Sequence, residues 1–185
     1  MGLMSEAVAA QYGYRSKDVA RERVKQSLVS VIRSWPREYH SGFLIHFTNR
    51  NLGILSEYST IDTAELVLGA LFAGNYFRGE VLKLATQLRD SVQWSNAIKA
   101  ANNPTIYSKV DPNTGQFSGD IRPYNEYYLV AYLAMKTSTD TESKVHKTTA
   151  TWLDSRQWGC FGTELICPFP IHERNRGILS RKIST

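Results

Sequence analysis

Apolar residues recur at three- and four-residue steps between residues 16 and 35, with polar residues at most of the positions between them. This spacing is typical of a helix with one buried stripe, and Pro36 is expected to end it. The following stretch, SGFLIHFTNRNLG, contains aromatic residues and is bounded by glycine, which predicts extended or looping chain. The members of the stripe are Val19, Ala20, Val24, Leu28, Val31 and Ile32.

The next two segments have the patterns of an inner helix and a surface helix. IDTAELVLGALFAGNYF, which begins at Ile61, is apolar nearly all round and rich in Ala, Gly and Leu, as expected for a helix surrounded by others. GEVLKLATQLRDSVQW has Val81, Leu84, Leu88 and Val92 on one stripe with charges opposite, so it is expected to cover the inner helix.

The remaining segments are predicted to continue this alternation. Residues 100–123 are rich in Asn, Pro, Gly and Asp, which predicts a long ordered loop or a short hairpin. Pro123 favours helix initiation, and YNEYYLVAYLAM is apolar on most sides, so a second inner helix is expected there. DTESKVHKTTATWLDSRQW is predicted to be a polar helix, and residues 158–185 to be irregular.

Composition is that of a globular protein of one domain. The chain has 185 residues, of which 42% are hydrophobic and 21% charged, and this length suits a single core. The net charge of +5 comes mainly from YRSKDVARERVKQ and HERNRGILSRKIST. Neither segment carries a nucleic-acid-binding motif, so these charges are expected to keep the chain in solution rather than to bind nucleic acid.

Several classes of site lack a motif in this sequence. There is no signal-peptide pattern and no apolar run of membrane-helix length, so the chain as given is expected to be cytosolic by default, without a membrane partner. Cys160 and Cys167 are too few for a metal cage and too widely spaced for a redox dithiol motif, although they could form a disulfide. With no phosphate loop and no nucleophile elbow, no cofactor is expected and carboxylate chemistry remains.

Two acids begin the two inner helices. If the surface helix returns the chain between them, the inner helices run parallel and Asp62 and Glu126 lie at the same end. Neighbouring helix axes are about 8 to 10 Å apart, so the carboxyl groups could reach the separation of about 6.5 to 9.5 Å that inverting glycosidases use. Helix capping is the competing interpretation for Asp62, because Ser59 stands three residues before it.

The surroundings of the other candidates leave two interpretations open for each. Glu126 lies among tyrosines, and aromatic neighbours both favour a protonated carboxyl group and stack against sugar rings, yet such a glutamate also fits ordinary packing. Glu57 is either a partner of the site or an exposed loop acid, and Glu65 either steadies the site or pairs with a base. His46 and His172 are each lone histidines among apolar residues, as hydrogen-bonded core histidines often are.

Three segments together resemble a known family. SEYSTIDTAELVLGALFAGNYF and YNEYYLVAYLA, with GFLIHF upstream, resemble the glycoamylase-like domain family, which includes endo-β-1,2-glucanases and a domain of cyclic β-1,2-glucan synthases. The resemblance covers residues 15–135. It implies an all-α fold, a partial (α/α)6 toroid of about three helical hairpins, and hydrolysis of a β-glucan with inversion.

The resemblance also implies roles for particular residues. Glu126 in YNEYY matches the general acid of the family, and Asp62 in STIDT matches an acid of the site. Trp94 resembles a tryptophan near the end of the outer helix that faces sugar or packs. The family's acid before that tryptophan is Gln93 here, and its Gly-Ser-Pro-Thr run is replaced by KTSTD. The expected substrate-binding residues are His46, Glu57, Trp94, Tyr124, Asn125 and Tyr127.

The length of the chain leaves three functions open, because a complete toroid takes about twice as many residues. The first is a glycoside hydrolase of a β-1,2-linked glucan. The second is a non-catalytic carbohydrate-binding or assembly fragment, in which Tyr107, Trp94 and Tyr127 contact the ligand. The third is a domain that transfers glucan chains within a larger synthase. A half toroid would expose its inner helices, which predicts self-association through these faces.

Overall fold

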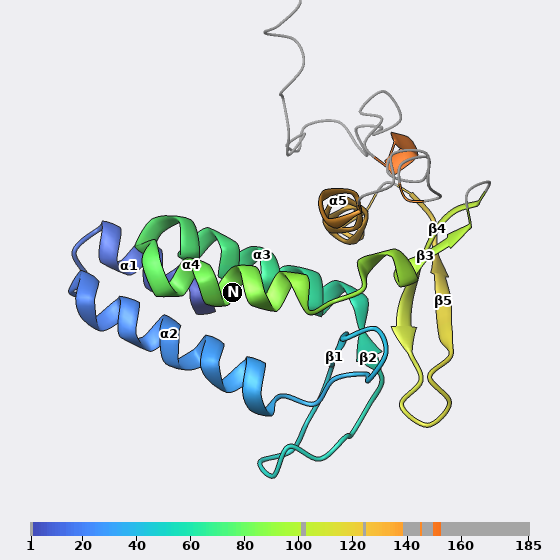
Figure 1. The fold of residues 1–185 in the computed structure, drawn as a ribbon, viewed down its shortest axis with the longest axis horizontal. Helices are drawn as coiled ribbons and strands as arrows, with labels where there is room; N and C mark the ends of the chain where they lie inside the picture. The colour runs from blue at the N-terminus through green and yellow to red at the C-terminus, as the bar shows by residue number, and fades with distance from the viewer. Residues whose placement is uncertain (1, 101–102, 124, 139–144, 146–149, 153–185) are drawn as a thin grey trace, which may run out of the picture. The chain divides into compact units, whose positions relative to one another are not determined.

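Four helices pack around a shared interior in the N-terminal half of the chain (Figure 1). The computed structural model describes residues 2–100, 103–123, 125–138, 145 and 150–152, all in one compact unit of residues 1–153. Helix α1 packs on α2 and α3, and α4 packs on α2 and α3 from the other side. The helices are α1 (Gly2–Gln11), α2 (Lys17–Ser34), α3 (Thr60–Phe77) and α4 (Gly79–Asp90).

The three predicted helices of this half form where their apolar periodicity lies, although Val19, a member of the predicted stripe of α2, is 49% exposed. Ser16 caps α2 by accepting a hydrogen bond from the Val19 N–H, and α2 ends at Ser34, two residues before Pro36. Helix α3 buries nine of its 18 residues, but it exposes Asp62, Glu65, Phe72 and Asn75 on one side, so the prediction that other helices surround it is wrong. Helix α4 buries mainly one face. Gly74 lets the two helices approach closely, because a Cβ there would lie 3.0 Å from the Leu82 Cα.

The prediction of an all-α toroid is wrong, because the structure contains a five-stranded antiparallel sheet. The central strand β4 pairs with β5 along one edge and with β3 and then β2 along the other, and β1 continues the sheet beyond β2. The described part of the predicted segment 100–123 therefore takes the hairpin alternative rather than the loop, with strands at residues 103–110 and 117–121. The strands are β1 (Leu44–Ile45), β2 (Tyr58–Ser59), β3 (Ile98–Ala100), β4 (Asn103–Val110) and β5 (Phe117–Ile121).

The β4–β5 hairpin forms because its residue types suit a sheet and a tight turn. Thr105, Ile106, Tyr107 and Val110 are β-branched or aromatic. In the turn, the Asp111 carboxylate accepts the backbone N–H groups of residues 113 and 114, each at 2.9 Å. These hydrogen bonds, first from residue 114 and then from residue 113, hold the pKa of Asp111 below its usual value.

The last described helix, α5 (Tyr128–Thr137), packs on α3 and on the short 3-10 helix η1 (Trp94–Ala97). It is seen end-on in Figure 1 while α3 runs across the view, so the two helices cross. The prediction that they run parallel is therefore wrong, because a hairpin and not only a surface helix separates them in the chain. Phe72 of α3 is 47% exposed and Tyr132 of α5 is 37% exposed, and self-association through such side chains stays a prediction.

Two further predictions fall largely or wholly on residues outside those described. They are the polar helix within residues 140–158 and the irregular segment 158–185, which contains Cys160, Cys167 and His172. Within the described part of the chain, no helix is long and apolar enough to cross a membrane.

Candidate functional site

The STIDT segment fixes the N-terminal end of α3 against the sheet. The Ser59 hydroxyl oxygen accepts a hydrogen bond from the Asp62 N–H at 3.2 Å, which makes Ser59 the N-cap. The Thr60 hydroxyl donates to a backbone carbonyl of β4 at 2.8 Å, and the Thr63 hydroxyl accepts the Leu44 N–H of β1 at 2.9 Å. Because Ser59, Thr60 and Thr63 are buried, the position of Asp62 is set by both α3 and the sheet.

His46 lies between two carboxylates at this end of α3. Its Nδ1 is 3.1 Å from the Glu57 Oε1, and its Nε2 is 3.6 Å from the Asp62 Oδ2. The His46 N–H also donates to the Glu57 backbone carbonyl at 2.9 Å, which pairs the two ends of the segment 46–57. A neutral imidazole has an N–H on one nitrogen only, whereas a protonated imidazole has one for each carboxylate. The position of the imidazole proton therefore decides which carboxylate accepts a hydrogen bond from His46.

These three side chains remain open to solvent. The side chains of His46, Glu57 and Asp62 are 33%, 36% and 49% exposed. Hydrogen bonds from its own backbone N–H and from His46 hold the pKa of Glu57 below its usual value, against the effect of burial. Glu57 is therefore an ionised acceptor at neutral pH that a ligand can reach.

Tyr127 connects α5 to this group. Its side chain forms a hydrogen bond with that of Ser108 in β4. Burial raises the pKa of the Tyr127 hydroxyl, and the negative charges of Glu126, Asp62 and Glu57 raise it further. Three carboxylates from separate segments thus lie within electrostatic reach of one phenol. We call His46, Glu57, Asp62, Glu126 and Tyr127 the carboxylate cluster.

The turn before α5 holds Glu126 at the edge of the cluster. Glu126 is exposed and precedes the N-cap residue Tyr127, so it lies outside the first helical turn where it was predicted. The Asn125 side chain accepts from the Tyr127 N–H and donates to the Arg122 carbonyl, each at 3.0 Å, and thereby shapes the turn. Tyr124 lies outside the described residues.

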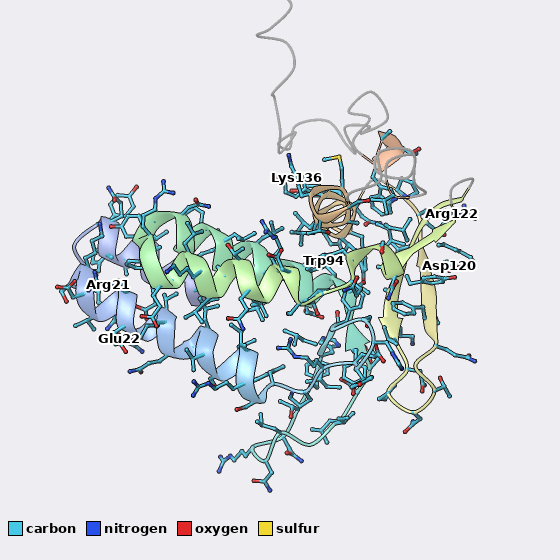
Figure 2. All side chains as sticks on the ribbon, viewed as in Figure 1. Arg21, Glu22, Trp94, Asp120, Arg122 and Lys136 are labelled. Carbon is cyan, nitrogen blue, oxygen red and sulfur yellow. The ribbon has the colours of Figure 1, made fainter. Side chains whose placement is uncertain are left out.

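Trp94 does not reach the cluster surface. Its side chain is buried where the chain passes from α4 into the sheet (Figure 2), and its Nε1 donates to the Arg89 carbonyl at 3.0 Å. Its ring packs edge-on against Phe43 with centroids 5.6 Å apart. Of the two roles considered for Trp94, the structure shows packing.

Three residues that were not predicted from the sequence lie beside the cluster. Phe47 stacks on His46 with centroids 3.8 Å apart and is 59% exposed. Ser108 contacts Tyr127, and the charge of Lys109 acts on Glu57. Phe47 could have been found from its place beside His46 in FLIHF, whereas Ser108 and Lys109 belong to a strand whose pairing with β2 has no local signal.

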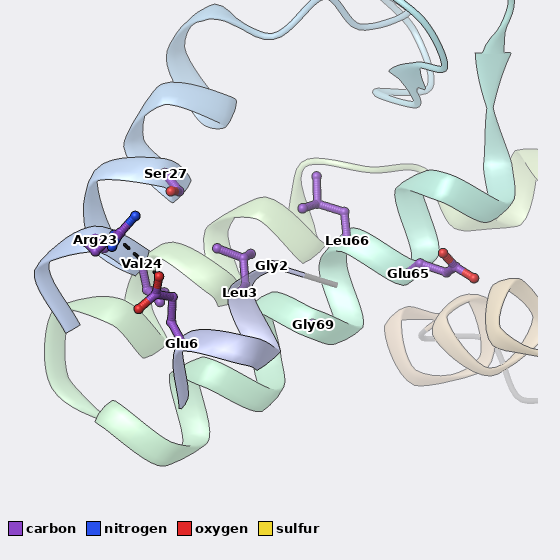
Figure 3. A pocket seen from close by; sticks show the side chains of 9 residues that line it. All are labelled: Gly2, Leu3, Glu6, Arg23, Val24, Ser27, Glu65, Leu66 and Gly69. Atoms are coloured by element: carbon purple, nitrogen blue, oxygen red, sulfur yellow. Dashed lines mark ion pairs between the residues drawn. The ribbon is translucent and has the colours of Figure 1, made fainter. Parts of the chain in front are cut away.

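A separate hollow of about 330 Å³ lies among α1, α2 and α3 (Figure 3). Glu65 lies on its lining rather than in the carboxylate cluster. Glu6, which also lines this hollow, forms ion pairs with Arg15 at 2.9 Å and with Arg23 at 3.4 Å. These ion pairs join α1 to the turn before α2 and to α2 itself.

The described residues contain no group of His, Cys, Asp and Glu that could hold a metal ion. A scan against models of known protein families gave no match, and searches of curated proteins and of solved structures gave none either.

Proposed function

We propose that the chain is a glycoside hydrolase domain that cleaves a β-glucan with inversion. The observation that carries this proposal is that Glu57 and Asp62 flank His46, while the charges of these two acids and of Glu126 act on Tyr127. Paired carboxylates are the groups that glycoside hydrolysis requires. The resemblance of STIDT and YNEYY to glucanases supports a β-1,2-linked substrate.

The reaction assigns one proton transfer to each of two carboxyl groups. In this scheme Glu126 gives a proton to the glycosidic oxygen, and that oxygen leaves as a hydroxyl group of the departing sugar. Water attacks the anomeric carbon from the opposite face while Asp62 accepts its proton. One C–O bond breaks and another forms, so the anomeric configuration is inverted.

The remaining cluster residues have positioning and binding roles in this proposal. His46 holds Asp62 from one nitrogen and is itself held by Glu57 from the other. Tyr127, whose raised pKa keeps its hydroxyl protonated, donates a hydrogen bond to a sugar oxygen or a carboxylate. The exposed Phe47 ring offers a flat apolar surface for a sugar ring beside these polar groups.

A non-catalytic carbohydrate-binding role is the second candidate. It is favoured by the exposure of Glu126, since no described residue donates a hydrogen bond to that carboxylate. In this case the cluster binds glucan hydroxyl groups without cleaving the chain. Both candidate functions use the same polar surface, so they are distinguished by whether the glucan is cleaved.

Product analysis of linear β-1,2-glucan after incubation with the purified chain separates the candidates. Free linear oligosaccharides whose new reducing ends are first formed in the α configuration are the expected result. An unchanged polymer that still binds the protein would replace the hydrolase proposal by the binding role. Rearranged or cyclic products would instead indicate transfer.

A further inference from the structure

A polar hollow of about 570 Å³ adjoins the carboxylate cluster. Glu57 belongs to both, so the two sites share one wall. Leu55 lies beside Glu57 on that wall, and Lys109, Asn113 and Ser118 line the other side from the β4–β5 hairpin. The volume falls within the range of about 300 to 1,000 Å³ that is usual for small-ligand sites.

Strand pairing anchors this hollow, whose lining comes mostly from the segment before β2 and from the β4–β5 turn. β2 directly follows the Glu57 wall, and its pairing of Ser59 with Lys109 sets that wall against β4. β5 pairs with the same strand, which places Ser118 opposite Lys109. The two sides are therefore attached to one sheet.

The chemistry of the lining suits a neutral ligand with many hydroxyl groups. Lys109 and Asn113 are hydrogen-bond donors, while Glu57 and Asp111 carry acceptor oxygens. Leu55 is 62% exposed and provides apolar contact for the carbon face of a sugar ring. One cation between two carboxylates leaves no excess positive charge, which disfavours a phosphate or other anion.

We propose that this hollow is a second sugar subsite. This proposal rests on the glycan function proposed above. The ligand then runs from the carboxylate cluster across Glu57 into the hollow, so the protein prefers a chain of several sugar residues over a single sugar. Glu57 contacts the sugar at the junction, and Lys109 and Asn113 contact the next one.

The test measures affinity for linear β-1,2-gluco-oligosaccharides of increasing length by titration calorimetry. All proteins carry Glu126→Gln so that no ligand is cleaved. Ser118→Trp fills the hollow, and Gln116→Trp, at an exposed position outside the lining, is the matched control. Circular dichroism and thermal unfolding establish that both variants fold as the parent does. Lys109→Ala is a second, smaller change to the lining of the hollow.

We expect affinity in the parent to rise with chain length by at least about tenfold, or about 1.4 kcal/mol. Ser118→Trp should remove that rise while leaving the affinity for the shortest bound oligosaccharide, and Gln116→Trp should keep it. An undiminished rise in Ser118→Trp would overturn the subsite but not the glycan function. Absence of binding to every oligosaccharide, with no glucan cleavage by the wild type, would overturn both.

Discussion

Gly42 provides the sharpest test of how the cluster is attached to the helices. Its φ is +77°, a conformation that favours glycine, and a Cβ at this position would lie 2.2 Å from the Ser91 carbonyl oxygen. Gly42→Ala therefore adds a backbone penalty of about 1 to 2 kcal/mol and an overlap that costs about 1 to 3 kcal/mol to relieve. The expected loss of unfolding free energy is about 2 to 5 kcal/mol.

Gly115 offers a matched control for this substitution. Its φ is +68°, but a Cβ there would meet nothing within 4 Å, so Gly115→Ala should cost only the backbone penalty of about 1 to 2 kcal/mol. Urea unfolding of the wild type and both variants, followed by circular dichroism, gives the comparison. Equal losses in the two variants would show that the segment before His46 does not pack on Ser91 as described.

Three further predictions concern single side chains. Burial opposes ionisation of Glu38, but hydrogen bonds from Ser41 and His40 outweigh it and hold its pKa below the usual value. Glu38→Gln should therefore lower the free energy of unfolding by about 1 to 3 kcal/mol at pH 7. In urea unfolding, the difference between the wild type and this variant should shrink as the pH falls below about 4.3. A difference that stays constant with pH would contradict the prediction. Burial raises the Tyr127 pKa, so the free energy of unfolding should fall as the pH rises past about 10, and it should fall less in Tyr127→Phe. Unfolding of both proteins at pH 9 and pH 11 measures this difference. An equal fall in the two proteins would contradict the prediction. Trp94→Ala should cost about 3 to 5 kcal/mol in thermal unfolding, whereas lost glucan affinity at unchanged stability would assign Trp94 to the ligand.

The helices of the N-terminal half could be predicted because their signal is local. The apolar stripe of α2 and the all-round apolar surface of α3 follow from residues a few positions apart. The sheet depends on partners far apart in the chain, and β1 and β2 have only two residues each. Such short strands carry no periodicity, so an all-α fold was the natural but wrong prediction.

The candidate site was predicted in its residues more than in its geometry. Asp62, Glu57 and His46 were all named from the sequence, but their connection through the imidazole depends on how residues 46–57 turn back on themselves. The start of α5 was placed too early because the Asn125 turn interrupts an otherwise helical pattern. Lys109 had no signal, since its role comes from pairing with Ser59.

The central claim is that the carboxylate cluster hydrolyses a β-glucan with Glu126 as the acid. The most direct measurement is the release of reducing ends from linear β-1,2-glucan by the wild type, by Glu126→Gln and by Glu65→Gln, an exposed glutamate of α3 that lines the separate hollow. We predict release by the wild type and Glu65→Gln and a loss of at least about a hundredfold in Glu126→Gln. Equal release by all three folded proteins, or release by none of them, would contradict the account.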